Sequence, residues 1–400
     1  MRQVAVVGAG MTRFGKHMDR SMKDLAREAI ENAMQAAGVE KDAIEAAAVG
    51  NAVAGLITGQ ECIRGQVVLR ELGIGGIPVI NTENACASSS TAFHLAWLYV
   101  ASGMYDMVLA LGMEKLFHSE KKRTYQAIGS AIDVEQSESF AREMSGERSA
   151  GAGKSRSVFM DFYANLARQH MDRYGTTQKQ FARIAAKNHT NGSLNPHAQY
   201  QTRRSVEDVL SAPLIAAPLT RMMCSPIGDG AAAVLITTAE KARQLTTRPV
   251  FVKASTLGSS KAHDQDTPGI VPSVAHKAYE QAGVGPNDLH VVEVHDATAP
   301  AELLIYEELN LCQPGEGGKL IDDGITQTGG RCPVNPSGGL LAKGHPVGAT
   351  GVAQICEIFW QLRGEAAQRQ VSGAKVGLTE NGGGVLGGEN AAASIHVFTV

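Results

Sequence analysis

The sequence predicts an α/β protein made of two similar halves. Short apolar strands alternate with amphipathic helices, which favours a sheet covered by helices. The segment Ala36–Ala52 (AAGVEKDAIEAAAVGNA) also resembles Gln281–Ala297 (QAGVGPNDLHVVEVHDA), 245 residues further on. The same offset places Val6 on Phe251, in a second β-branched segment. We therefore expect an internal duplication, and 400 residues are enough for several packed units.

Each predicted element of the first half has a local signal. Val4–Val7 is β-branched and ends at a glycine, as a buried strand does. Met22–Ala37 has helical periodicity and is followed by Gly38, a typical residue after a helix. Gly228–Thr237 contains a continuous apolar run, which indicates a strand buried on both faces.

The middle of the chain differs from both halves in composition and periodicity. Residues 117–217 are rich in polar and charged residues with helical spacing, and we expect a mostly helical insertion there. The first half would then comprise 1–116 and 218–245, and the second half 246–400. No low-complexity linker separates these parts, so we expect them to pack together.

Composition excludes several classes of protein. The chain has 37 basic and 40 acidic side chains, and a net charge of −3 provides no electrostatic footprint for nucleic acid. No window approaches the roughly 18 apolar residues that span a bilayer, and no secretory leader is recognisable. The six cysteines form no CxxC pair and no HExxH motif occurs, so we expect reduced thiols, no metal site and a cytoplasmic location.

One candidate nucleophile lies in the segment Val79–Gly103. The pattern predicts a strand, a polar turn and a helix that begins near Cys86. The positive end of a helix dipole favours a thiolate, which is the reactive form of cysteine. A buried structural cysteine is the alternative interpretation of Cys86.

Three further segments each follow an expected strand end, where ligand sites of α/β proteins gather. His345 lies in a glycine- and proline-rich loop before an expected helix at Thr350–Leu362; it is either a base toward a thiol or a surface histidine. His295 lies between a strand and an expected helix at Pro300–Leu309. The glycines of VGLTENGGGVLGG (Val376–Gly388) are expected after a strand, where backbone N–H groups can hold an oxyanion.

Over nearly its whole length the chain resembles the thiolase superfamily, in particular the sterol-carrier-protein-type and archaeal-type thiolases (acetyl-CoA acetyltransferase-like). The motifs that carry this resemblance are NACASSS, KNH with GSLNP, SPIGDGAAA, HDA, NPSGGLLAKGHPVGATG and the final GGG. The resemblance implies two βαβαβαββ halves in a five-layer α-β-α-β-α arrangement with an inserted loop domain. It also implies an acyl-CoA substrate with coenzyme A as co-substrate, no permanently bound cofactor, and a homodimer or dimer of dimers.

The resemblance also implies roles for individual residues. Cys86 would carry the acyl group, and His345 would activate its thiol. His295 and His345 would line one oxyanion hole, for the thioester enolate. The backbone N–H groups of Cys86 and Gly382 would form a second, for the tetrahedral intermediate.

The sequence departs from the family at the second catalytic cysteine. The two positions where relatives carry this residue are Glu380 and Ala297 here. A carboxyl group whose pKa is raised by burial can replace a thiol as acid and base. We therefore expect Glu380 to handle the proton at the substrate α-carbon, with His295 as the competing candidate.

The expected activity is CoA-dependent cleavage of a 3-oxoacyl-CoA, or the reverse Claisen condensation, through an acyl-enzyme on Cys86. A bulky or aromatic substrate such as benzoylsuccinyl-CoA is as compatible with the sequence as acetoacetyl-CoA. Two alternatives are retro-aldol cleavage of a β-hydroxyacyl-CoA and a non-catalytic acyl-binding subunit. The resemblance further suggests a small partner protein with a zinc ribbon and an OB-fold.

Overall fold

The computed structural model describes residues 1–145, 156–262 and 268–400. Residues 146–155 of the expected insertion therefore lie outside the described residues. The strands are β1 (Val4–Met11), β2 (Ala46–Gly50), β3 (Val79–Thr82), β4 (Met107–Glu114), β5 (Leu214–Ala216), β6 (Leu219–Thr220), β7 (Gly230–Thr238), β8 (Val250–Ser259), β9 (Val291–Glu293), β10 (Val376–Leu386) and β11 (Glu389–Thr399).

Outside the insertion, one or more helices follow each strand up to β9, and β10 leads directly into β11. The helices are α1 (Met22–Ala37), α2 (Ala54–Thr58), α3 (Arg64–Glu71), α4 (Ser88–Ser102), α5 (Lys121–Gly129), α6 (Ser137–Ser145), α7 (Val158–Tyr174), α8 (Gln178–Gly192), α9 (Val206–Ser211), α10 (Ala239–Leu245), α11 (Ile270–Ala282), α12 (Ala299–Glu308), α13 (Gly317–Asp322), α14 (Gly339–Ala342) and α15 (Thr350–Arg363). None of the helices in the described residues is long and apolar enough to cross a membrane.

The duplication is visible in the order of the strands. The described part of the chain forms a nine-stranded sheet in the order β3-β2-β4-β7-β1-β8-β11-β10-β9. Strands β1 and β8 pair antiparallel at its centre, so β2-β4-β7-β1 on one side mirror β9-β10-β11-β8 on the other. Helices α1 and α11 end 245 positions apart, and β2 and β9 begin 245 positions apart. The offset found in the sequence is thus the offset between equivalent elements.

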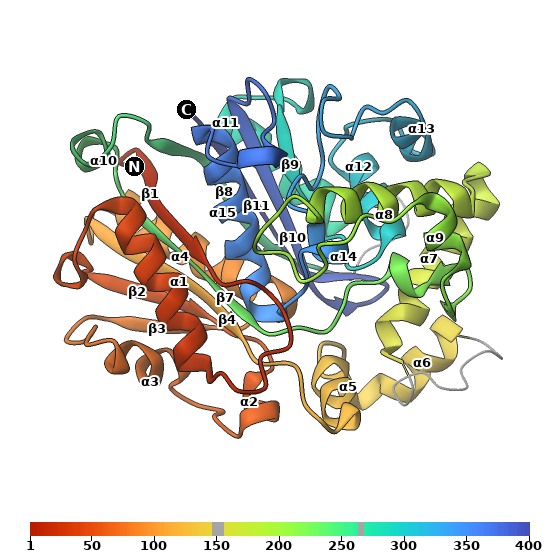
Figure 1. Cartoon of the computed structure of the whole chain (residues 1–400), viewed down its shortest axis with the longest axis horizontal. Helices are drawn as coiled ribbons and strands as arrows, with labels where there is room; N and C mark the ends of the chain where they lie inside the picture. The colour runs from red at the N-terminus through yellow and green to blue at the C-terminus, as the bar shows by residue number, and fades with distance from the viewer. Residues whose placement is uncertain (146–155, 263–267) are drawn as a thin grey trace.

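Helices cover both faces of this sheet. Helix α1 packs on β1, β4 and β7, while α11 packs on β8 and β11. Helices α4 and α15 contact each other between the two half-sheets. Figure 1 shows α15 in the middle of the molecule and α1 on the opposite side of the first half-sheet. This helix–sheet–helix–sheet–helix order confirms the predicted α/β thiolase fold.

Alternating side chains of one strand supply two separate cores. In β4, Leu109 and Leu111 pack with α1, whereas Val108 and Ala110 pack with α4 and α15. Successive side chains of a strand point to opposite faces, so a strand buried on both faces is apolar throughout. This explains the continuous apolar runs in the sequence.

The second half lacks one expected strand. A full βαβαβαββ unit requires a counterpart of β3, but the equivalent segment forms only a single parallel bridge, between Val292 and Val334. Pro333 and Pro336 flank this bridge. Proline has no N–H to donate to a sheet, so the strand cannot extend.

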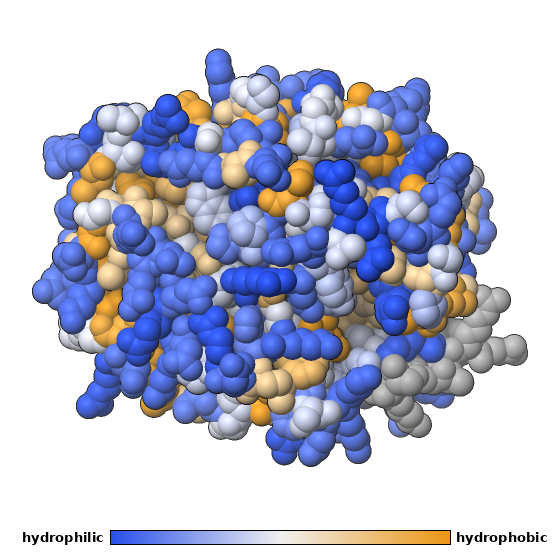
Figure 2. Space-filling view, in the orientation of Figure 1, coloured by the Kyte–Doolittle hydropathy of each residue, from blue (hydrophilic) through white to orange (hydrophobic). Residues whose placement is uncertain are grey.

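The insertion gathers on one side of the molecule. Helices α5–α9 lie between β4 and β7 in the chain. Figure 1 shows α6–α9 on the right, away from α1 and α3, and α5 at the lower centre, where it contacts α2. Figure 2 shows a largely polar surface on this face, with apolar residues scattered over it. The boundaries at 116/117, 217/218 and 245/246 stay predictions.

Candidate active site

Cys86 is presented by a tight turn at the end of β3. The turn is a 3-10 segment, Ala85–Ala87, and α4 starts directly after it. Ala85 has φ 47°, a strained value for a residue with a Cβ, and its N–H donates to Glu83 Oε1 at 2.6 Å. The Ser88 hydroxyl closes the turn by accepting the N–H of Asn84 at 3.0 Å. Strained backbone of this kind is often found at functional sites.

His345 is held by a hydroxyl that fixes its tautomer. Its Nδ1 lies 2.7 Å from Thr350 Oγ1, and that hydroxyl donates its one hydrogen to the carbonyl of Pro346 at 3.1 Å. Thr350 Oγ1 must therefore accept from Nδ1–H. The proton-free nitrogen is then Nε2, which makes His345 ready to act as a base.

His295 follows β9 and is oriented through its backbone. Its N–H donates to Glu380 Oε2 at 2.9 Å. Its Nε2 is buried and has no hydrogen-bond partner among the described residues. The rings of His295 and His345 meet nearly edge to face, with centroids 5.2 Å apart and planes at 68°.

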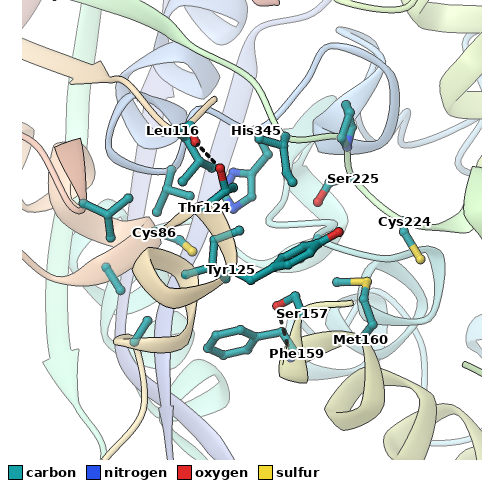
Figure 3. Close-up of a pocket in the computed structure, with 18 of the residues that line it drawn as sticks. Cys86, Leu116, Thr124, Tyr125, Ser157, Phe159, Met160, Cys224, Ser225 and His345 are labelled. Carbon is teal, nitrogen blue, oxygen red and sulfur yellow. Dashed lines mark hydrogen bonds between the residues drawn. The ribbon is translucent and has the colours of Figure 1, made fainter. Parts of the chain in front are cut away.

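The structure brings these three side chains to one point. The sulfur of Cys86 and one ring nitrogen each of His295 and His345 all lie within 4.8 Å of one another. All three line a cavity of about 490 Å³. Figure 3 shows the Cys86 sulfur beside the His345 ring, with Tyr125 across the cavity. Residues from both halves and from the insertion thus share one cavity.

Burial sets the charge of these groups. It raises the pKa of the Cys86 thiol to about 12, although the backbone N–H of Gly384 opposes the rise. Burial also lowers the pKa of His295 to about 4 and the pKa of His345 well below its usual range. The resting site therefore holds a neutral thiol beside neutral imidazoles. Desolvation thus opposes the stabilisation of a thiolate that is expected from the start of a helix.

Glu380 lies inside β10, behind the cavity wall. It is fully buried, its Oε1 has no partner among the described residues, and it is not part of the cavity lining. Burial raises its pKa to about 7, while the N–H of His295 opposes the rise. Glu380 is thus able to gain or lose a proton near neutral pH, one layer behind His295.

The glycine run lies within a strand rather than after it. We expected the glycines to follow a strand, but β10 continues through them to Leu386. A Cβ on Gly383 would lie 2.1 Å from the carbonyl oxygen of Asn84, so only glycine lets β10 approach the Cys86 turn. Gly384, with φ 62°, lines the cavity, whereas Gly382 does not.

Hydrogen bonds from two other motifs hold the segment His295–Ala297 in place. Asp296 accepts from the backbone N–H groups of Leu340 (2.7 Å) and Leu341 and from Asn188 Nδ2 at 2.8 Å. Lys187 forms a buried ion pair with Glu302. The KNH motif of the insertion is therefore a support for the second half, and its residues do not line the cavity.

The structure adds cavity residues that no sequence pattern indicated. These are Tyr125, Arg156, Tyr163 and Cys224, all supplied by the insertion or the segment after it. Figure 3 shows the Cys224 sulfur on the far side of the cavity from Cys86. These four residues lie in segments without a recognisable motif. They line the cavity only because the folded chain turns their side chains toward it.

Comparisons with known proteins identify the family of this chain. Residues 4–240 match the model "Thiolase, N-terminal domain", and residues 253–396 match "Thiolase C-terminal domain-like". The chain is 42% identical to the acetyl-CoA acetyltransferase of Methanothermobacter thermautotrophicus over 100% of both chains. It is 37% identical to sterol carrier protein 2 of Bos taurus, covering 96% of this chain and 71% of that one.

A third relative carries a more specific name. The benzoylsuccinyl-CoA thiolase subunit BbsB of Thauera aromatica is 36% identical over 96% of this chain and 95% of that one. Two solved structures share the fold. The Ltp2-ChsH2(DUF35) aldolase has a TM-score of 0.78 at 24% identity, covering 98% of this chain and 97% of that one. Human mitochondrial 3-ketoacyl-CoA thiolase in complex with CoA has a TM-score of 0.72 at 18% identity, covering 100% and 98%. This chain belongs to the thiolase family, and it is an acyltransferase.

Proposed function

We propose that the chain transfers an acyl group from a 3-oxoacyl-CoA to free CoA, or runs the reverse Claisen condensation, through a covalent intermediate on Cys86. The observation that carries the proposal is the placement of one thiol and two imidazole nitrogens within 4.8 Å of one another at a cavity. A nucleophile beside a base that is itself oriented by a third group is the usual signature of covalent catalysis.

In the first half of the reaction His345 Nε2 takes the thiol proton as the sulfur attacks the 3-keto carbon. The C2–C3 bond then breaks, and the acyl group that contains C3 stays on Cys86. The electron pair of the broken bond leaves with C2, as the enolate of the thioester that keeps the original CoA. His295 and protonated His345 stabilise the enolate oxygen. In the second half the thiol of free CoA attacks the acyl-enzyme and regenerates Cys86. The raised pKa of the Cys86 thiol favours a proton transfer that is coupled to the attack.

Backbone N–H groups would stabilise the tetrahedral intermediates. The family resemblance implies Cys86 and Gly382 for this role. In the structure the N–H of Gly384 faces the Cys86 thiol, and Gly384 rather than Gly382 lines the cavity. We therefore extend the proposal to Gly384. Loss of one such donor reduces the rate by about 10²–10³-fold.

The proton at C2 is assigned to Glu380, with His295 as the competing group. Glu380 has a pKa of about 7 and is suited to giving and accepting a proton at neutral pH. His295 is nearer to the substrate, because its ring lines the cavity. The low pKa of His295 keeps its ring neutral, which suits a hydrogen-bond donor better than a group that accepts and returns a proton.

The substrate is proposed to be bulky, and an acyl-CoA with a carboxylate fits the cavity lining. Arg221 lines the cavity, where a guanidinium can pair with such a carboxylate, whereas Lys343 is buried against Glu293 at 3.2 Å. Within the described residues Arg221 forms no ion pair. The similarity to a benzoylsuccinyl-CoA thiolase subunit supports this substrate class.

We further propose a cytoplasmic homodimer or dimer of dimers, with a small zinc-ribbon/OB-fold partner. The word "subunit" in one relative's name and the DUF35 component named with one structural neighbour support a partner. Size-exclusion chromatography of the chain, alone and co-expressed with small neighbouring proteins, measures both states. A monomer that elutes alone in every case would contradict this proposal.

Intact-protein mass spectrometry tests the main proposal. Incubation with a panel of 3-oxoacyl-CoA esters is expected to add one acyl mass to the chain, and Cys86→Ser is expected to add none. Addition of free CoA should remove the acyl group. Cleavage of a β-hydroxyacyl-CoA without an adduct would favour the retro-aldol alternative, and absence of any reaction would favour a non-catalytic subunit.

A further inference from the structure

Cys86, His295 and His345, called the trio below, carry side chains of the kinds that bind metal ions. A thiol sulfur and two imidazole nitrogens within 4.8 Å of one another are the donor types that Zn²⁺ prefers. His295 is 4% exposed, and its Nε2 has no partner among the described residues. Buried polar atoms are normally satisfied, so an unpartnered nitrogen on a side chain that lines the cavity points to a ligand.

We propose that Cys86, His295 and His345 bind one Zn²⁺ ion when the cavity holds no acyl-CoA, and that this ion reversibly blocks the nucleophile. The inference uses the site of the proposed function, but it does not require that the proposed reaction occurs. Metal binding depends only on the three side chains and on access through the cavity.

The geometry requires a small closure. Zn–S and Zn–N bonds of about 2.3 and 2.0 Å place tetrahedral ligand atoms about 3.5 Å apart. Ligand atoms that already lie within 4.8 Å reach that separation after side-chain shifts of about 1 Å. The three protein ligands leave a fourth position for water or for the thiol of CoA, as in open zinc sites.

The surroundings support a cation at this point. The hydrogen bond from His345 Nδ1 to Thr350 leaves Nε2 free to coordinate and keeps the ring oriented, as outer partners of zinc-bound histidines do. Glu83, whose carboxylate accepts the N–H of Ala85, lines the same cavity.

The binding step is balanced without a redox change. The S–H bond of Cys86 breaks and an S–Zn bond forms, while the proton leaves to solvent and the ion stays Zn²⁺. The two imidazoles donate lone pairs and lose no proton. A chelator reverses the step and returns the thiol.

The test uses the full chain, first treated with a chelator and a reducing agent. Zn²⁺ is titrated against a chromophoric chelator, and iodoacetamide labelling of Cys86 is followed by peptide mass spectrometry. We expect one Zn²⁺ per chain, protection of Cys86 from alkylation, loss of this protection when a chelator is added, and release of the ion when acyl-CoA is added. Co²⁺ in place of Zn²⁺ should give the absorption of a tetrahedral thiolate site.

Variants identify the ligands. Cys86→Ser and His295→Asn are each expected to weaken Zn²⁺ binding by more than about 10-fold. Cys224→Ser is the matched control, because this thiol lines the cavity outside the trio, and it should keep the wild-type affinity. Equal Zn²⁺ binding by Cys86→Ser, equal loss in Cys224→Ser, or unprotected Cys86 would each overturn the inference. Thermal melting of each variant shows that it is folded.

Acyl-enzyme formation in zinc-free buffer tests the proposed function separately.

Discussion

Replacement of Glu380 by glutamine separates the chemistry of this carboxyl from its effect on stability. Glutamine keeps an acceptor for the N–H of His295, which now bonds to Glu380 Oε2 at 2.9 Å. It removes the ability to give or accept a proton. We therefore expect Glu380→Gln to lose proton exchange at the α-carbon of the acyl-CoA while Cys86 is still acylated.

The structure also gives the magnitude of a stability effect. Burial raises the pKa of Glu380 from 4.5 to about 7, which corresponds to about 3 kcal/mol. Below about pH 4.5 the carboxyl is protonated in both the folded and unfolded states, so it carries no penalty. Between about pH 4.5 and 7 the folded state binds more protons, and stability falls as pH rises. Above about pH 7 the folded protein bears the whole cost. Glu380→Gln should therefore be more stable than the wild type by up to about 3 kcal/mol at pH 8, and nearly equal to it at pH 4.5.

Two measurements check this reasoning. Denaturant unfolding of both proteins at acidic and alkaline pH gives the stability difference, and NMR of acyl-CoA in D₂O gives the exchange rate. Glu308→Gln is the control, since burial also raises the pKa of Glu308, to about 8, but the N–H of His295 donates to Glu380 and not to Glu308. The control should keep exchange. Unchanged exchange in Glu380→Gln would assign the proton to His295, and a stability difference that does not depend on pH would refute the electrostatic argument.

Four other predictions follow from single contacts. Cys86→Ser should reduce turnover by at least about 10³-fold in steady-state assays, because hydroxyl is a far poorer nucleophile than thiolate; near-normal kcat would exclude covalent catalysis. Thr350→Val removes the 2.7 Å contact to His345 and should lower kcat about 10-fold with little change in KM, whereas a change in KM alone would point to substrate binding. Alkylation of resting Cys86 should keep rising to about pH 9 or beyond, since its pKa is raised to about 12, and a plateau near neutral pH would show a preformed thiolate. Lys187→Met should destabilise the fold by about 3 kcal/mol in denaturant unfolding, because it leaves Glu302 buried and unpaired; an unchanged midpoint would contradict that view.

Much of the fold could be predicted because its signals are local. Helix α1 begins after Ser21, whose side chain caps it together with Asp24, and it ends at Gly38. The structure has the predicted bounds, Met22–Ala37, since capping and periodicity need no distant partner. The 245-residue offset likewise indicated the pairing of halves before any contact was known.

Other features depended on contacts that no local pattern records. The glycines of β10 look like a loop, yet they form a strand, because close approach to the carbonyl of Asn84 demands residues without a Cβ. Tyr163 looks like an ordinary residue of an amphipathic helix, and only packing turns it into the cavity. The raised pKa of the Cys86 thiol was not predictable from the sequence, because burial cannot be read from helix position.

By itself the sequence determined the element order, the duplication and the identity of the candidate reactive side chains, since these are written in short-range patterns and motifs. The tertiary structure alone decided that the residues at positions 86, 295 and 345 share one cavity, and in which protonation state they rest. The physical reason is that reactivity depends on the distance between atoms far apart in the chain and on the water excluded around them, and both exist only after the two halves and the insertion have packed together.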